Sequence, residues 1–308
     1  MGISWRVGSW PPRTTNSIIS DVFEVTTRAV AAPAGGSIVT PGRFATVGAD
    51  RFQAGAVVKS RPDGAVDAGF GNAGSQLVHF EQQPNKDEVI GLFPSSGNTL
   101  LVAGYVESMT QPYARPALHR LLANGALDTS FGTGGKVIID TQPFGIAADF
   151  DFRGAIQAPD GKILPVGSCS ECGHGSFGDF MALRVNANGT VDSGFGNEGW
   201  VGFGRTDAQD HYVPEVATSI AVDTEGRVVL GGYGEAYDDQ DHQTQPLLVR
   251  AAPGGQLDTT FDGAGFFDIT LSGSFAIPAI AIDACNDGIV HREHHEYRRV
   301  AIRTRRRK

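Results

Sequence analysis

A motif that recurs four times along the chain constrains its fold more than any other feature. The segments VDAGFGNAG, LDTSFGTGG, VDSGFGNEG and LDTTFDGAG begin at Val66, Leu127, Val191 and Leu257. Their aspartates lie 61, 64 and 66 residues apart, and each is followed three residues later by a phenylalanine. The members of this repeat motif are Asp67, Phe70, Asp128, Phe131, Asp192, Phe195, Asp258 and Phe261. Self-similarity at a fixed period predicts a fold built from repeated structural units.

Two further elements recur with the same period of about 62 residues. A turn followed by an apolar strand that ends in glycine reads PGRFATVG from Pro41, SGNTLLVAG from Ser96, DGKILPVG from Asp160 and EGRVVLGG from Glu225, and a fifth copy begins at Asp287. A short strand ending in Asp-Gly, Asn-Gly or Gly-Gly follows in each repeat, and these pairs favour tight hairpin turns. Each repeat is therefore predicted to contain four strands.

The apolar runs and the glycine content both favour an all-β fold. The chain has 41 glycines in 308 residues, which is close to twice the usual frequency of roughly 7%. Runs such as TLLVAG lack alternation, which is typical of strands covered on both faces. A repeated four-stranded sheet of this kind is most simply a β-propeller blade, whereas the repeats of a solenoid, the competing fold, usually span about 20 to 45 residues.

We therefore predict an all-β protein, a β-propeller of about five four-stranded blades with a ring closed by the N-terminal strand. Residues 1–28 form an N-terminal segment with that closing strand, DVFEVTT from Asp21, which would pair with the incomplete fifth blade. Residues 29–290 form the propeller repeats. Residues 291–308 form a basic tail that is partly strand near Arg299–Arg303.

The consensus of these elements resembles the delta-60 repeat, a poorly characterised bacterial family. The shared pattern is an apolar strand, DGK, an apolar strand ending in Gly, then A-L-x-R, N-x-N-G and L-D-x-x-F-G-x-x-G, and it extends from residue 29 to about 290. The chain departs from it at Asp262, which replaces the glycine after Phe261, and at Ser95–Asn98, which replaces Asp-Gly-Lys. The resemblance implies a bacterial β-propeller with an extracellular or cell-surface setting and implies no particular activity.

The repeat motif itself is interpreted as structural. An aspartate at this position can accept backbone N–H groups one or two residues ahead, as in an Asx-turn, while the phenylalanine fills the gap between neighbouring sheets. A residue repeated in every unit usually serves the unit. The functional alternative is that the four aspartates bind calcium or act on a sugar.

Binding residues are predicted where the repeats differ, because rigid scaffolds carry their recognition residues on loops. The segments Glu107–Pro116, Cys169–Asp179 and Glu235–Pro246 join the second and third strands of successive repeats and are expected to share one rim. The candidate binding residues on these loops are Tyr113, His174, Tyr237, Asp238, Asp239 and Asp241. Aromatic and carboxylate groups together suit a carbohydrate, a basic peptide or calcium.

Three cysteines are too few for a disulfide framework in a chain of this length. Cys169 and Cys172 form a CxxC with His174 beside it, which is a candidate metal site if a fourth ligand comes from elsewhere. The alternatives are a redox disulfide, a local disulfide or two loop thiols without a role. No cofactor is predicted, and calcium at the acidic loops is the alternative.

The net charge of -9 is unevenly distributed. Residues 291–308 hold eight Arg or Lys and two Glu, so the rest of the chain carries about -15. An acidic body argues against general nucleic-acid binding, which needs a basic face. The basic tail is interpreted as solvated or as altered by an interrupted reading frame, with nucleic acid, anionic lipid or a metal as its alternative partners.

Two observations bear on location. No run of about 18 apolar residues is present, so no membrane span is predicted. Residues 1–21 lack the unbroken apolar core of a signal peptide, which leaves a cytoplasmic location open beside the extracellular one.

Two functions from different classes follow. The preferred hypothesis is a non-enzymatic propeller that acts as a binding or scaffold module for a protein or carbohydrate. The alternative is a propeller-type lyase or glycosidase that uses carboxylates near the central channel. A cluster of carboxylates with raised pKa values in a funnel would favour the enzyme.

Overall fold

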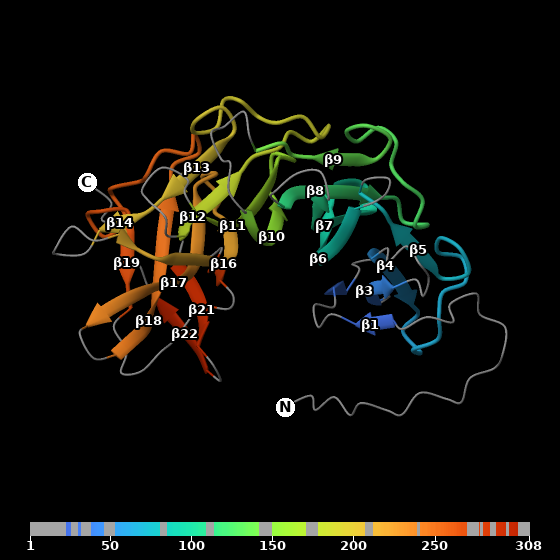
Figure 1. Ribbon diagram of the computed structural model, residues 1–308, viewed down its shortest axis with the longest axis horizontal. Helices are drawn as coiled ribbons and strands as arrows, with labels where there is room; N and C mark the ends of the chain where they lie inside the picture. Colours follow the sequence, from blue (N-terminus) through green and yellow to red (C-terminus); the bar gives the residue numbers. More distant parts are fainter. Residues whose placement is uncertain are drawn as a thin grey trace.

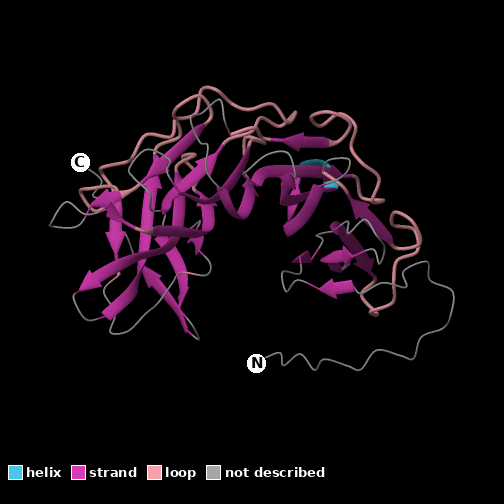
Figure 2. Ribbon diagram, viewed as in Figure 1, coloured by secondary structure: helices cyan, strands magenta, loops and turns pink. Residues whose placement is uncertain are grey.

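The structure is a computed structural model, and it describes residues 23–25, 30–31, 38–45, 53–80, 85–108, 114–141, 150–170, 178–206, 212–238, 241–269, 277, 280–283, 288–293 and 296–300. The strands of these residues are β1 (Phe23–Val25), β2 (Val30–Ala31), β3 (Ile38–Ala45), β4 (Gln53–Ser60), β5 (Ser75–Val78), β6 (Asn85–Ser95), β7 (Thr99–Ser108), β8 (Ala114–Leu121), β9 (Lys136–Ile138), β10 (Phe150–Gln157), β11 (Ile163–Ser170), β12 (Gly178–Leu183), β13 (Trp200–Phe203), β14 (Arg205–Thr206), β15 (Tyr212–Val213), β16 (Glu215–Val222), β17 (Val228–Asp238), β18 (Asp241–Ala251), β19 (Phe266–Asp268), β20 (Ile280–Asp283), β21 (Gly288–Glu293) and β22 (Glu296–Val300). A single 3-10 turn at Ser96–Asn98 is the only helical element among them, so the described chain is all-β, as predicted (Figure 2).

The strands form successive up-and-down antiparallel units, numbered here in chain order. Unit 1 contains β1–β5, unit 2 contains β6–β9, unit 3 contains β10–β13, unit 4 contains β16–β19 and unit 5 contains β20–β22. Units 3 and 4 are separate four-stranded sheets, whereas units 1 and 2 are joined by one parallel pair, Gln53 with Lys86. The prediction of repeated four-stranded antiparallel sheets is confirmed by units 2, 3 and 4. Strand also extends into the basic tail, because β21 continues to Glu293 and β22 covers residues 296–300.

The glycine that ends each repeated apolar strand has a steric reason. Gly104, Gly167 and Gly232 each pair with the first strand of their unit immediately before a break in register. A Cβ atom on these glycines would lie 1.9, 2.1 and 1.9 Å from a carbonyl oxygen of that strand. Two strands therefore approach closely at the same point of each unit, and only glycine fits there.

The predicted closing of a ring by the N-terminal strand is wrong for the described strands. β1 pairs with β3 of its own unit, with Phe23 opposite Phe44, and β2 pairs with the other end of β3. Strands close in sequence pair with little loss of loop entropy, which favours this local arrangement over a join between the two ends of the chain. β20–β22 form a sheet of their own, and Figure 1 shows units 1 and 5 at the two ends of an open arc.

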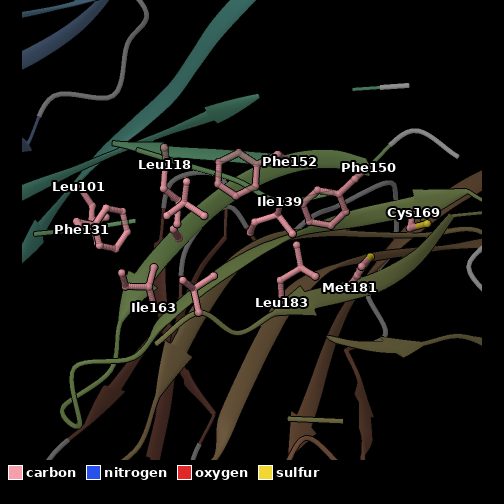
Figure 3. Packing of buried hydrophobic residues seen from close by; sticks show 14 residues of the cluster. Leu101, Leu118, Phe131, Ile139, Phe150, Phe152, Ile163, Cys169, Met181 and Leu183 are labelled. Atoms are coloured by element: carbon pink, nitrogen blue, oxygen red, sulfur yellow. The ribbon is translucent and has the colours of Figure 1, made fainter. Parts of the chain in front are cut away.

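The hydrophobic core lies between neighbouring units. Figure 3 shows one cluster in which Leu101 and Leu118 of unit 2 pack with Phe152, Ile163 and Leu183 of unit 3. An equivalent cluster joins units 3 and 4. The sheet of unit 3 is therefore covered on both faces, as the unbroken apolar runs predict. No helix in the described residues is long and apolar enough to cross a membrane.

Candidate functional site

In every unit that carries the repeat motif, the aspartate accepts a hydrogen bond from the backbone N–H two residues ahead and the phenylalanine is fully buried. Asp128 Oδ1 accepts hydrogen bonds from the backbone N–H and hydroxyl of Ser130 at 3.1 and 2.6 Å. Its Oδ2 lies 2.7 Å from Nε of Arg120, whose guanidinium group covers the Phe131 ring at 4.6 Å. Phe131 is fully buried. These are the burial and the Asx-type hydrogen bond that the repetition predicts.

The same triad of cation, aspartate and phenylalanine recurs in units 1, 3 and 4. Its members are Lys59, Asp67 and Phe70 in unit 1, Arg184, Asp192 and Phe195 in unit 3, and Arg250, Asp258 and Phe261 in unit 4. The pKa values of all four aspartates are lowered, for Asp128 mainly by the Ser130 hydroxyl and for Asp192 mainly by Lys162. Carboxylates that already pair with a cation and with backbone N–H groups favour the structural interpretation over a calcium or sugar site.

In units 1, 2 and 3, the residue after the motif phenylalanine joins its unit to the next one. Backbone N–H groups of Gly71, Gly132 and Gly196 donate to carbonyl oxygens of the next unit's tight turn at 2.7, 2.7 and 2.8 Å. The turn glycine that follows, such as Gly189, has φ +93°, and a Cβ there would lie 2.6 Å from the nitrogen of Gly132. We call this repeated contact the inter-unit latch. Asp262 takes the glycine position in unit 4 and keeps a positive φ of 48°, which aspartate tolerates better than most residues.

The variable segments leave the sheets at one end, which we call the loop end. Each joins the second and third strands of its unit, from β7 to β8, from β11 to β12 and from β17 to β18. In unit 4, β17 and β18 remain paired as far as Asp238 with Asp241, whereas β16 ends opposite Gly234. Residues 235–238 and 241–244 therefore form a two-stranded ribbon that extends beyond the rest of the sheet (Figure 1).

The candidate binding residues fall on or beside these segments. The ribbon contains Tyr237, Asp238 and Asp241, of which the structure describes the backbone alone. The candidates that lie outside the described residues are Tyr113, Cys172, His174 and Asp239. Their grouping into one site stays a prediction.

A charged cluster around the buried Glu215 lies at the base of the ribbon. Glu215, with no exposed surface, accepts a hydrogen bond from Arg205 Nε at 2.5 Å, and Arg205 Nη1 lies 2.7 Å from Asp268. A Cβ on Gly234 would lie 2.9 Å from Arg205 Nη2, so the ribbon begins directly on this arginine. Burial raises the pKa of Glu215 to about 7, and the negative charges of Asp179 and Asp268 act in the same direction against Arg205.

Sequence reasoning missed Glu215. In unit 4, Glu215 occupies the position that Asp87 occupies in unit 2, because each lies two residues before the register break of its first strand. Asp87 is also buried and accepts a hydrogen bond from the backbone N–H of Phe80 at 3.0 Å. The sequence signal that could have revealed Glu215 was therefore an acidic residue at the same position of the first strand in units 2 and 4.

A second buried titratable side chain lies in unit 2. His119 on β8 is 1% exposed and meets the Phe80 ring edge to face at 4.7 Å. Burial, followed by the positive charge of Lys136, lowers the pKa of His119 to about 3. This histidine is neutral in the folded protein at physiological pH.

Cys169 is buried and disulfide-bonded. The other two cysteines of the chain lie outside the described residues. A sulfur in a disulfide is not a thiolate ligand for a metal. Among the described residues, no three His, Cys, Asp or Glu side chains are grouped so that they could hold a metal ion.

A family model identifies the repeats. The family described as a domain of unknown function (DUF5122) beta-propeller matches residues 98–131, 158–195 and 226–261. Three segments of the chain match the model of this β-propeller repeat. Each matched segment ends at the motif phenylalanine, so the DUF5122 repeat contains the triad and the strands leading to it. The match confirms the resemblance to a poorly characterised propeller repeat family.

Comparison with solved structures finds similar proteins at low identity. The α-L-arabinofuranosidase Arb93A from Fusarium graminearum, solved with an iminosugar inhibitor, is 9% identical with a TM-score of 0.52, covering 88% of this chain and 78% of that chain. A protein of unknown function from Dyadobacter fermentans is 13% identical with a TM-score of 0.48, covering 91% and 79%. An ulvan lyase of polysaccharide lyase family PL25 is 14% identical with a TM-score of 0.47, covering 89% and 64%. No curated protein matches the chain. At these identities the similarity concerns the fold alone.

Proposed function

We propose that the protein is a non-enzymatic β-propeller of about five blades that binds a protein or carbohydrate partner at its loop end. The observation that carries this proposal is the β17–β18 ribbon, which extends beyond its sheet while its base rests on Arg205. The triads and latches hold the units rigidly, and the segments that differ between repeats all leave the sheets at this end. A rigid scaffold with variable loops is the usual arrangement of a recognition module. Because the repeats resemble the delta-60 family, which implies a cell-surface setting, the partner would be bound at a bacterial cell surface.

The geometry of Glu215 supports binding over catalysis. An acid that acts on a substrate must reach it within hydrogen-bond distance, directly or through one water. Glu215 has no exposed surface and is held by Arg205, so its raised pKa follows from burial beneath the ribbon.

The test replaces residues 235–244 of the ribbon with a short Gly-Ser turn. The probes are a hexalysine peptide, an array of immobilised oligosaccharides and calcium chloride. We expect the parent protein to bind at least one of them and the ribbon variant to lose that binding with its melting temperature unchanged, because the exchanged residues lie beyond β16 and β19. A matched variant with a Gly-Ser exchange of Arg61–Asp63, an exposed turn of unit 1 opposite the loop end, should keep binding.

A propeller-type lyase or glycosidase is the second candidate, and the pair of Glu215 with Asp179 in the neighbouring sheet favours it. Its test is Glu215→Gln, assayed for release of reducing ends or unsaturated products from the same oligosaccharides. Turnover by the parent protein that disappears in this variant, with binding that survives the ribbon exchange, would overturn the proposed binding module.

A further inference from the structure

The contact between units 2 and 3 includes a side chain that bridges the two turns opposite the loop end. Gln157, the last residue of β10, accepts a hydrogen bond from the backbone N–H of Ser96 in unit 2 at 2.6 Å. Its amide nitrogen donates to the carbonyl oxygen of Gly161 in its own turn at 2.9 Å. Gln157 therefore fills the space between these turns.

The contact between units 3 and 4 lacks this bridge. Pro94, Gln157 and Val222 are equivalent, since each pairs with the first or second residue of the strand that follows. Val222 has no polar atom with which to reach the turn of unit 3. A pocket of about 250 Å³ lies there, between the turn at Asp160–Lys162 and the turn at Asp223–Gly226. One residue thus distinguishes this contact from the contact between units 2 and 3, and that residue, Val222, lines the pocket.

Four of the five charged side chains at the pocket wall are paired with an opposite charge, and the fifth, Asp160, accepts a hydrogen bond from the backbone N–H of Lys162 at 3.0 Å. Lys162 Nζ and Arg184 Nε lie 2.9 and 2.7 Å from the same oxygen of Asp192. Asp223 and Glu225 both pair with Arg227, at 2.5 and 3.1 Å. An anionic ligand would have to separate Lys162 or Arg184 from Asp192, which is costly in a partly desolvated site. A cationic ligand would find only Asp160 without an ion pair, and would meet there the positive charges of Lys162 and Arg184.

A neutral ligand with several hydroxyl groups meets no such penalty. Its hydroxyls can donate to the carboxylate oxygens of Asp160 and Glu225 and accept from Lys162, while its C–H face packs on Leu164, Val222 and Pro253, all of which line the pocket. The volume is somewhat below the range of about 300 to 1,000 Å³ that is typical of sites for drug-sized ligands. The pocket therefore suits a single ring.

We propose that the pocket between units 3 and 4 binds one neutral sugar ring, either as a monosaccharide or as one residue of a longer glycan. The turns that form it lie at the start of β11 and β17, at the opposite end of the sheets from the ribbon. The site is independent of the loop end, so the two proposals succeed or fail separately.

The experiment is saturation-transfer difference NMR on the full chain with glucose, galactose and mannose, and with glucosamine and glucuronate as cationic and anionic counterparts. We expect millimolar binding of at least one neutral hexose and weaker or no transfer to the charged sugars. Val222→Gln, which rebuilds the bridge of units 2 and 3, should reduce the hexose signal to background. Gln157→Val, the reciprocal change at the other contact, should leave it in place.

Thr224→Trp is the second blocking variant, because Thr224 is exposed at the pocket wall and its substitution does not disturb the core. Loss of the signal in either folded blocking variant supports the proposal. Three outcomes overturn it: no neutral hexose bound by the parent protein, hexose binding that persists in both blocking variants, or a stronger signal from glucosamine or glucuronate than from every neutral hexose.

Discussion

Burial of His119 in unit 2 makes the stability of the fold depend on pH. His119 is equivalent in register to Leu183 and Val249, since these residues pair with Lys136, Trp200 and Phe266 at the start of the last strand of their units. The other units therefore show that an aliphatic side chain fits this position. The substitution that tests this pH dependence is His119→Leu.

The expected magnitude follows from the two pKa values of His119. The unfolded chain titrates at the ordinary value of 6.5, whereas burial lowers the folded value to about 3. At pH 5 the unfolded state alone gains a proton, which stabilises it by about 2 kcal/mol, and at pH 7.5 that gain is below about 0.1 kcal/mol. Because the folded pKa is depressed, the wild type loses stability as the pH falls below 6.5.

The assay is urea unfolding of both proteins at pH 5 and pH 7.5. The free energy of unfolding of His119→Leu relative to the wild type should rise by about 2 kcal/mol from pH 7.5 to pH 5. Comparing the two pH values cancels the change in packing against Phe80, which does not depend on pH. Leu183→His is the reciprocal control and should lose more stability at pH 5 than at pH 7.5. Equal effects of His119→Leu at both pH values would refute the conclusion that burial keeps this histidine neutral.

Two further predictions concern the latch and the buried acid. Gly189→Ala places a Cβ 2.6 Å from the Gly132 nitrogen, whereas Gly134→Ala, also at a positive φ, meets no atom within 4 Å. Thermal unfolding should show Gly189→Ala to be less stable by about 1 to 3 kcal/mol beyond its control, and equal losses would contradict the latch. For Glu215, the raised folded pKa of about 7 means that the wild type loses stability as the pH rises from 4.5 through 7. Relative to the wild type, Glu215→Gln should therefore gain roughly 3 kcal/mol between pH 4.5 and pH 8, and a pH-independent difference would show that Glu215 is ionised in the folded state throughout.

The candidate sites separate into those that local sequence can reveal and those that depend on neighbours. The variable loops were visible as departures from the repeat, and the ribbon of unit 4 lies in one of them. The burial of Glu215 was not visible, because an acid before a strand is exposed or buried according to what covers it, here Arg205 and the base of the ribbon. The pocket between units 3 and 4 likewise depends on the position of Val222 opposite a turn of another sheet.

The sequence by itself determined the structure of the single repeat unit of this protein. Tight turns, close strand approaches and buried aromatic plugs depend on residues within one period, so the recurrence of Asp128, Phe131 and Gly135 in other repeats was enough to predict the strands and the structural role of the motif. Only the tertiary structure decided how the units join. The latch links residues more than fifty positions apart, such as Gly132 and Asn188, and β1 pairs within unit 1 although its sequence suits another edge equally well. A strand's backbone groups can pair with any open edge, so the choice between edges is made by loop length and packing, which no single repeat encodes.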